Sequence, residues 1–420
     1  YESCFPFQTS HHPEKTLAEA MGFRYRCASA DDYRDYYLPL LARKRGEGQR
    51  FMGCQLTNDY AVKNYGWTAA RAEEFGFDRW EDEFGPHLKR LLDAPLESPD
   101  RDVLLVFPTY AAAALTDGPV HSVDAMTIDV LLRTFGCQMV RVGSPRFDKM
   151  TAAEMDRFKL IIVPCAAYLV PQTYERLKAS EATVLFTGCF GQSWDAVHVP
   201  AGQTRELDGM TLRYHPRPPG RLEFTADHPL VNNLKGTSVP LPQDECFSFE
   251  TAASGVQALA RCDPHAILSV ARQGRFIFAH GHLWAGLALD PNRKPPANLS
   301  GSKDGSANDI DMWGPYSATS PHNRVGETLM KNILDHAGVD YRVLRPKPRG
   351  LTPYLGDHME QTSISANIVY NNTGERQILT VRLPYKPAGH QSRRVDNHYE
   401  TDVAVEPFAY VALQGFQPRN

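Results

Sequence analysis

One cysteine of this chain stands where a nucleophile could act. Cys189 lies in the segment Thr187-Gly-Cys-Phe-Gly-Gln, directly after the apolar run Thr183–Thr187. A thiol in a tight turn after a strand can attack a carbonyl carbon if a nearby histidine takes its proton. His280 and His282 are the candidate bases. The pattern therefore offers a thiol-dependent hydrolase as one interpretation.

The turn around Cys189 can be compared with a known catalytic turn, and the comparison leaves a purely structural role open. Class I glutamine amidotransferases carry their nucleophilic cysteine in a Gly-x-Cys-x-Gly elbow on a flavodoxin-like sheet, and this segment resembles that elbow. Thr187 stands where the first glycine would be, and neither histidine is followed two residues later by glutamate. These departures leave open an ordinary turn at the edge of a sheet, in a domain without catalysis.

The two histidines could instead be metal ligands. Side chains at positions i and i+2 of a strand share a face, and His11, His12 and either Asp309 or Asp311 could complete a set. No spacing of the H-E-x-x-H kind connects these residues, and an exposed hairpin end explains the pair as well. We therefore expect no metal and no other cofactor.

The composition is that of a globular protein with full hydrophobic cores. The 420 residues are 42% hydrophobic and 22% charged, and this length favours two or three domains. The net charge is −4 with scattered basic residues, so we expect no nucleic-acid partner. No apolar run approaches the roughly 20 residues of a membrane span. The eight cysteines form no C-x-x-C pair, which indicates buried free thiols rather than a disulfide framework or a zinc site.

Strands and helices alternate from residue 98 to about residue 187. Continuous apolar runs indicate strands that are buried on both faces, and segments with one polar face indicate the helices between them. This alternation predicts an α/β fold with a parallel, doubly wound sheet. We expect strands at Asp102–Phe107, Gln138–Val142, Leu160–Cys165 and Thr183–Thr187, and helices near Val120–Phe135, Ala152–Phe158 and Gln172–Ala179.

We expect this α/β domain to cover residues 98–345. The segments Ala266–Ala271 and Arg275–His280 flank Gln273-Gly274 and predict a hairpin. A loop rich in Pro, Gly, Ser, Asn and Asp covers residues 291–322. Val325–Ala337 then forms an amphipathic helix.

Residues 346–420 predict a small antiparallel β domain, which a Pro-rich linker at Arg345–Pro353 connects to the rest. Beyond the linker, hydrophobic and polar residues alternate with the period of two that half-buried strands require. Such a domain typically packs as a sandwich. The expected strands lie at Ser363–Tyr370, Gln377–Leu383 and Asp402–Leu413.

The order of these parts resembles the family 42 glycoside hydrolases and their relatives. In that family a (β/α)8 catalytic barrel is followed by a flavodoxin-like trimerisation domain and a small β-sandwich. The resemblance rests on Asp102-Val-Leu-Leu-Val-Phe, Lys159-Leu-Ile-Ile-Val-Pro-Cys, Tyr174-Glu-Arg-Leu-Lys, Ala182-Thr-Val-Leu-Phe-Thr-Gly and Val403-Ala-Val-Glu-Pro-Phe-Ala-Tyr-Val-Ala-Leu.

The resemblance implies that residues 1–97 are the carboxyl-terminal portion of a (β/α)8 catalytic barrel. Phe51–Thr57 would be the eighth strand, with Asp31–Arg45 and Pro86–Leu92 as the last two helices. The chain begins with Tyr1 rather than Met and shows no leader-like segment, so we expect it to start partway through a larger protein.

The resemblance also implies where catalytic carboxylates belong. Barrel active sites lie at the carboxyl ends of the strands, and this clan keeps its nucleophile at the end of strand seven. Glu2 is therefore the implied nucleophile, with a residue before Tyr1 as its rival. The acid/base partner belongs to strand four and would lie outside this chain.

A cluster at the end of the expected eighth strand could bind sugar. Sugar sites combine polar groups that pair with hydroxyls and aromatic faces that stack on C–H groups, and this cluster supplies both. A helix-capping Asn-Asp turn beside core aromatic residues is the alternative. The cluster consists of Gln55, Asn58, Asp59, Tyr60 and Trp67.

These observations lead to a retaining glycosidase with two carboxylates, acting on β-linked sugars and on galactosides first by analogy with the family. The alternative is a non-catalytic oligomerisation or carbohydrate-binding portion of such an enzyme. The expected partners are a glycoside substrate and either identical subunits or the rest of the barrel. The loop 291–322, with Trp313 and Tyr316, is long enough to reach a neighbouring subunit or to be a surface excursion.

Overall fold

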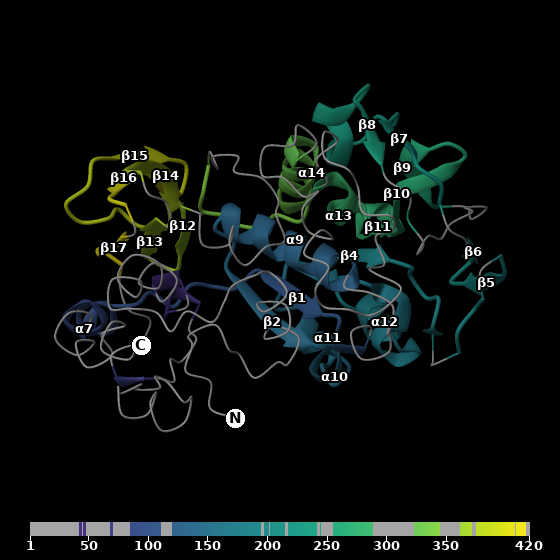
Figure 1. Cartoon of the computed structure of the whole chain (residues 1–420), viewed down its shortest axis with the longest axis horizontal. Helices are drawn as coiled ribbons and strands as arrows, with labels where there is room; N and C mark the ends of the chain where they lie inside the picture. Colours follow the sequence, from purple (N-terminus) through teal and green to yellow (C-terminus); the bar gives the residue numbers. More distant parts are fainter. Residues whose placement is uncertain are drawn as a thin grey trace.

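A computed structural model describes residues 42–43, 45–47, 68–69, 85–110, 120–194, 197–200, 202–214, 217–241, 244, 255–288, 323–344, 362–371, 375–407 and 409–416. These residues form an α/β domain and a small β domain at its side (Figure 1). Short helical pieces at residues 42–43 and 45–46 and helix α7 (Gly85–Asp93) precede both. No helix within these ranges is long and apolar enough to cross a membrane.

The centre of the α/β domain is a sheet that contains, within the described residues, nine strands in the order β2-β1-β3-β4-β11-β10-β9-β7-β8. The strands from β2 to β11 run parallel, and the remaining ones are antiparallel. Their bounds are β1 (Val103–Phe107), β2 (Met139–Gly143), β3 (Leu160–Val163), β4 (Thr183–Gly188), β7 (Gly220–Phe224), β8 (Ser238–Leu241), β9 (Gln257–Cys262), β10 (His265–Ala271) and β11 (Phe276–His280).

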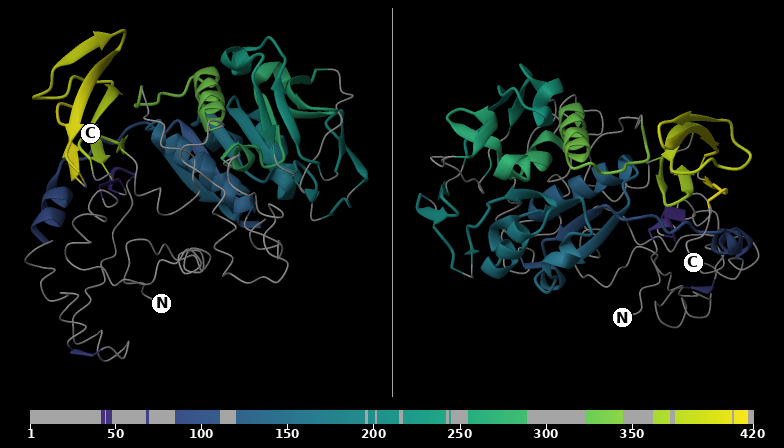
Figure 2. Two further views of the ribbon diagram at one scale, coloured as in Figure 1. Left: turned by 45° about the horizontal axis from the view of Figure 1, so that its top comes forward. Right: turned by 180° about the vertical axis from the view of Figure 1, so that it is seen from behind.

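The predicted parallel sheet is confirmed for these first strands, and alternate residues of β1 explain why helices cover both faces. Val103 and Leu105 pack with Ile128 and Leu131 of α9 (Val120–Thr134). The residues between them, such as Leu104, belong to the core of the opposite face. Each buried strand therefore needs a helical layer on either side. That opposite layer comprises α10 (Ser144–Phe147), α11 (Ala152–Met155) and α12 (Pro171–Ala179), whereas α13 (Leu283–Ala288) and α14 (Asn323–His336) join α9 (Figure 2).

The predicted hairpin before residue 280 is also present. Strands β10 and β11 pair antiparallel from Leu268–Ala279 to Ala271–Phe276. The turn takes left-handed backbone angles at Gln273 (φ 59°) and Gly274 (φ 87°). The reversal returns β11 to the direction of β4, so the two pair in parallel and the turn joins the parallel and antiparallel halves of the sheet.

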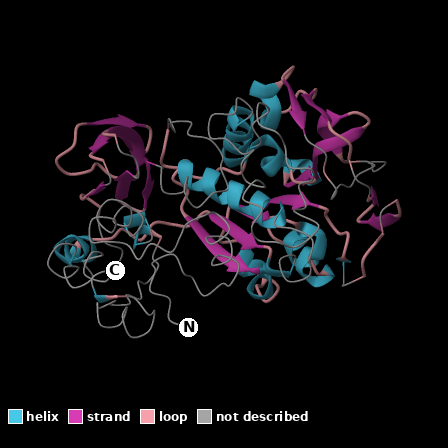
Figure 3. Ribbon diagram, in the orientation of Figure 1, coloured by secondary structure: helices cyan, strands magenta, loops and turns pink. Residues whose placement is uncertain are grey.

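The small β domain consists, within the described residues, of two three-stranded antiparallel sheets around one core (Figure 3). The predicted single strand at Ser363–Tyr370 is wrong, because Ala366 turns the chain at φ 50°. The segment folds into the hairpin β12–β13, with Ser365 opposite Ile368. The sheets contain β12 (Thr362–Ser365), β13 (Ile368–Asn371) and β17 (Ala409–Ala412), and β14 (Gln377–Leu383), β16 (His398–Val405) and β15 (Ser392–Val395).

The segment before the α/β domain is tied to its neighbours by polar contacts. The Arg45 guanidinium donates a hydrogen bond to the Ala94 carbonyl at 2.8 Å. The Asn367 side chain donates to the Pro95 carbonyl at 2.9 Å and accepts one from the Glu97 amide at 2.8 Å. Helix α7 matches the helix expected at Pro86–Leu92. The described residues contain no strand before β1, so they do not show a closed barrel.

Candidate functional site: a buried charged cluster at the carboxyl edge of the sheet

The carboxyl ends of the parallel strands carry a cluster of buried polar side chains. This edge is where doubly wound sheets bind their ligands. Thr187 lies near the end of β4, His280 ends β11, and His282 follows immediately before α13. Asp124 reaches the same place from α9, and Asp244 from a single described position between β8 and β9. All five side chains are buried.

Asp124 connects two elements on the helical side of the cluster. One carboxylate oxygen accepts a hydrogen bond from the Thr187 hydroxyl at 2.7 Å. The other accepts from the Ala285 amide at 3.0 Å and so fixes the start of α13. Burial raises the pKa of the Asp124 carboxyl, and the neighbouring His282 charge and these hydrogen bonds only partly oppose that shift.

His282 and Asp244 form a buried ion pair. The Nδ1 atom of His282 lies 3.0 Å from Oδ1 of Asp244, and the His282 amide donates to Oδ2 at 2.7 Å. Burial alone would lower the pKa of His282, but the charge and the hydrogen bond of Asp244 outweigh it and raise that pKa. Burial likewise opposes ionisation of Asp244, but its contacts with His282 lower the pKa of this carboxyl. The imidazolium and the carboxylate therefore stabilise each other's charged form.

His280 has a different role, although it is only two residues away. Its Nε2 atom lies 2.9 Å from the Ser269 hydroxyl on the neighbouring strand β10, and its ring stacks on Phe278 at 6.1 Å. Burial lowers the pKa of His280 to about 3, so the ring is neutral near pH 7. The two histidines that the sequence offered as one catalytic or metal-binding pair are thus a neutral core residue and a charged partner of Asp244.

Cys189 cannot serve as a nucleophile in this state, because it is disulfide-bonded and buried. The expectation of free thiols is therefore wrong at this position. Cys137, Cys165 and Cys262 agree with it, since they are buried thiols outside any disulfide. Burial raises the pKa of Cys137 and of Cys165, which keeps both thiols protonated and unreactive.

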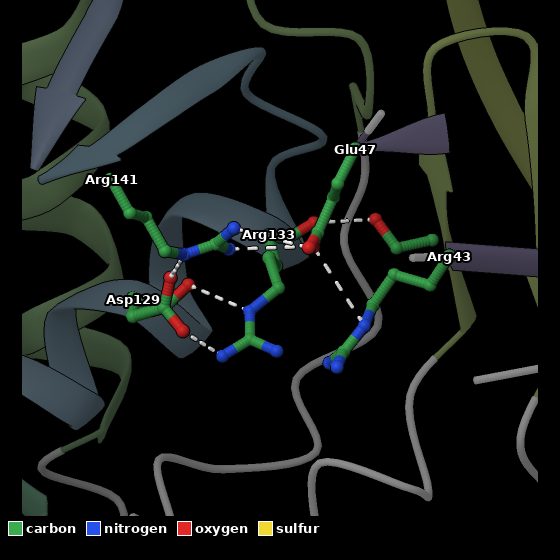
Figure 4. A network of polar contacts seen from close by, with 6 residues as sticks. Arg43, Glu47, Asp129, Arg133 and Arg141 are labelled. Carbon is green, nitrogen blue, oxygen red and sulfur yellow. Dashed lines mark hydrogen bonds and ion pairs between the residues drawn. The ribbon is translucent and has the colours of Figure 1, made fainter. Parts of the chain in front are cut away.

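A second charged cluster joins the segment around residue 45 to the α/β domain (Figure 4). The Arg141 guanidinium donates to both oxygens of Glu47 at 3.1 and 3.3 Å and to Asp129 at 2.7 Å. Arg133 forms an ion pair with Asp129 on the same helix. The Nε atom of Arg43 lies 3.8 Å from Oε1 of Glu47. Burial opposes the ionisation of Glu47, but the surrounding guanidinium groups lower its pKa to about 2. Glu47 is therefore a charged anchor for this segment.

The residues that the sequence singled out for sugar chemistry lie outside the described residues, so their roles stay predictions. They are Glu2, Gln55, Asn58, Asp59, Tyr60 and Trp67. The candidate metal ligands His11, His12, Asp309 and Asp311 and the loop residues Trp313 and Tyr316 also lie outside the described residues. Within the described ranges no group of His, Cys, Asp and Glu side chains is arranged to hold a metal ion. Sequence reasoning missed Asp124 and Asp244. A carboxylate inside the apolar pattern of the expected helix at Val120–Phe135 was the available signal for the first.

The chemistry open to the edge cluster is limited by its burial. A general base has to reach a substrate proton directly or through one water. The carboxylates of Asp124 and Asp244 instead hold His282, Thr187 and the start of α13 in place. The cluster therefore positions the loops at this edge of the sheet.

Comparison with known proteins finds similarity in fold only. No protein-family model matches the sequence, and no curated protein matches it. The α-L-fucosidase isoenzyme 2 from Paenibacillus thiaminolyticus is similar with a TM-score of 0.52 and 12% identity, over 93% of this chain and 58% of that one. A β-galactosidase from the psychrophilic Marinomonas ef1 aligns with a TM-score of 0.41 and 10% identity, over 80% of this chain and 42% of that one. Gan42B, a GH42 β-galactosidase, aligns with a TM-score of 0.45 and 9% identity, over 88% and 46%.

The chain thus spans between 42% and 58% of the length of these glycosidases. At such identities the likeness concerns the fold alone. In this chain the fold is a mixed α/β domain with a large, partly parallel sheet and separate small antiparallel sheets.

Proposed function

We propose that this chain is the carboxyl-terminal part of a glycoside hydrolase that cleaves β-linked sugars, with β-galactosides as the first candidates. The observation that carries the proposal is the order and packing of its parts. A segment anchored through Glu47 precedes a doubly wound α/β domain, and a small β-sandwich follows it. In support, the fucosidase aligns with 93% of this chain at a TM-score of 0.52. The activity itself comes from analogy with such proteins.

The proposed chemistry needs two carboxyl groups about 5 to 5.5 Å apart. One carboxylate attacks the anomeric carbon while the second, as an acid, gives its proton to the departing glycosidic oxygen. The resulting glycosyl ester is then hydrolysed by water, which the second group deprotonates. We assign the first role to Glu2 and the substrate contacts to Gln55, Asn58, Asp59, Tyr60 and Trp67. The second carboxyl group would come from the remainder of the barrel.

The described domains then have a supporting role. Their candidate site is closed by burial, and its cysteine is disulfide-bonded. This observation favours, as a second candidate, a non-catalytic oligomerisation or carbohydrate-binding portion of a glycosidase. It counts against a thiol hydrolase at Cys189, because a disulfide sulfur has no thiolate to attack with.

The test is hydrolysis of nitrophenyl β-D-galactoside by this chain and by the chain extended with the residues encoded upstream. Turnover by the extended chain that Glu2→Gln abolishes and iodoacetamide leaves intact supports the proposal. Glu223→Gln, an exposed glutamate on β7, is the matched control. A start codon directly before Tyr1, or turnover that Glu2→Gln does not change, would refute the assignment. Sugar binding without turnover in both chains supports the second candidate.

A further inference from the structure

A cleft of about 350 Å³ lies at the opposite, amino edge of the sheet, between the α/β domain and the small β domain. From its lining we propose that it is a binding site for a neutral sugar of one or two rings, separate from the catalytic barrel. Its walls come from the connection before β1, from the starts of β1 and β3, and from the small β domain. The residues that carry the argument are Glu97, Asp102, Lys159, Arg342, Tyr385 and Phe416.

One wall is a rigid bidentate ion pair. The two terminal nitrogens of Arg342 donate to the two carboxylate oxygens of Glu97 at 2.7 and 2.9 Å. Both side chains are nearly buried, with 4% and 11% of their surface exposed. Arg342 also donates to the Ala366 carbonyl, so it connects the cleft to the β12–β13 turn. Because the guanidinium and the carboxylate hold each other, the polar groups of this wall keep their orientation without a ligand.

The second wall is built on Asp102, at the start of β1. One of its oxygens accepts hydrogen bonds from the Lys159 ammonium at 2.7 Å and from the Asp340 amide at 3.1 Å. The Lys159 side chain is 48% exposed, so its remaining donors can reach a ligand. This wall offers both donors and acceptors, as sugar hydroxyls require.

The third wall is aromatic. The rings of Tyr385 and Phe416 lie 5.7 Å apart with their planes tilted by 57°. The Tyr385 hydroxyl is buried beside the Glu97 carboxylate, its neighbour in the lining of the cleft. Burial and the Glu97 carboxylate raise the pKa of Tyr385, so its hydroxyl keeps its proton as a donor. The phenol and the Glu97 carboxylate therefore form one polar corner next to the aromatic faces of the cleft.

Size and charge select the class of ligand. The volume falls within the roughly 300 to 1,000 Å³ of small-molecule sites. Among the described lining residues, carboxyl groups outnumber cationic ones by four to two, namely Glu97, Asp100, Asp102 and Asp340 against Lys159 and Arg342. That excess repels phosphate, sulfate and acidic sugars. Hydrogen-bonding walls beside aromatic faces suit a neutral pyranose, whose hydroxyls and C–H faces need different partners.

The choice of a sugar, rather than another neutral ligand, rests on the proposed function. Binding and turnover can be tested separately, because the described lining belongs to the connection before β1 and to the two domains, whereas the proposed catalytic residues belong to the expected barrel segment. A binding-deficient variant should therefore retain hydrolysis of small aryl glycosides. Loss of catalysis through Glu2→Gln should in turn leave the affinity of the cleft unchanged.

The experiment is calorimetric titration and saturation-transfer NMR of the full chain with D-galactose, L-fucose, lactose and spermidine. We expect binding of at least one sugar and none of spermidine. Phe416→Ala should weaken sugar affinity roughly tenfold by removing one stacking face. Phe107→Ala, an exposed phenylalanine at the other edge of the sheet, is the matched control and should change nothing.

Two further variants keep the test decisive if Phe416→Ala disturbs folding. Tyr385→Phe removes only the buried hydroxyl, and Asp100→Asn changes an exposed carboxylate of the lining. Each should weaken sugar binding while the melting temperature stays within about a degree of the parent, because Asp100 is exposed and Tyr385→Phe keeps the packed ring in place. No sugar binding, sugar binding that all three variants leave intact, or preferential binding of spermidine would each overturn the proposal.

Discussion

Asp244 and His282 contact each other twice, through Nδ1 at 3.0 Å and through the His282 amide at 2.7 Å. Both side chains are nearly fully buried, at 4% and 2% exposure. A buried charge of this kind is tolerated because its partner is held in place, and removal of one partner is costly even where the pair itself adds little stability.

We therefore predict that Asp244→Asn destabilises the protein by about 3 to 5 kcal/mol, because it removes the charge that offsets the His282 imidazolium. Urea unfolding followed by circular dichroism measures the effect. Asp227→Asn, at a carboxylate whose side chain is 86% exposed, should change the free energy of unfolding by less than about 0.5 kcal/mol. The double variant Asp244→Asn with His282→Gln should cost less than the sum of the single ones, and additive losses would contradict a direct pair.

Glu47 should make stability depend on acidity. Its pKa is 4.5 for an ordinary glutamate and about 2 in the folded chain, so folding favours the ionised form. The stabilisation is complete above the unfolded value and is lost as the pH falls from 4.5 towards 2. It amounts to something on the order of 3 kcal/mol.

The check is the free energy of unfolding of the parent and of Glu47→Gln between pH 7 and pH 2. We expect the parent to lose stability more steeply with acid than the variant does. Glu181→Gln, at an exposed glutamate, should follow the parent curve. Parallel curves for the parent and Glu47→Gln would show that the pKa of Glu47 is not depressed by its arginine neighbours.

Cys189 should be recovered in a cross-linked peptide when the unreduced protein is digested and analysed by mass spectrometry, because it is disulfide-bonded. Iodoacetamide should label neither Cys137 nor Cys165 in the folded protein, since burial keeps both thiols protonated and shielded. Denaturation without reductant should expose these two to labelling but not Cys189. Alkylation of Cys189 in the native, unreduced protein would reopen the thiol-hydrolase interpretation.

The parallel strands were predictable to within about two residues because buried strands leave uninterrupted apolar runs. Leu160–Val163, for example, is buried along its whole length. The β12–β13 turn was missed because its left-handed backbone angle falls on Ala366, a residue without turn preference, although Asn367 beside it is a common turn residue. Residues distant in the sequence stabilise this turn, because the Asn367 side chain donates hydrogen bonds to the carbonyls of Pro95 and Leu413.

The candidate site was less predictable for the same physical reason. Asp244 and its partner His282 are 38 residues apart in the sequence, and Asp124 and its partner Ala285 are 161 residues apart. No local pattern encodes such pairs, because each carboxylate looks like a surface residue until the sheet brings its partner close. In the sequence, His280 and His282 were candidate bases or metal ligands, or an exposed hairpin end. The exposed alternative is wrong because both side chains are buried, and no local pattern indicated that one is neutral and the other charged.

Arg342 should control how the small β domain is attached. Its guanidinium binds Glu97 with two hydrogen bonds and the Ala366 carbonyl with a third, and 4% of its side chain is exposed. Arg342→Leu keeps much of the apolar volume but leaves the Glu97 carboxylate without this partner in a nearly buried place. We expect a loss of about 3 to 5 kcal/mol at this contact.

Limited proteolysis should then cut the connection before β12 at least ten times faster, while α/β-domain fragments stay intact. Arg394→Leu, an exposed arginine of β15, is the control and should be cut at the parental rate. Equal cleavage of Arg342→Leu and the parent would mean that the sandwich is held by its apolar contacts alone.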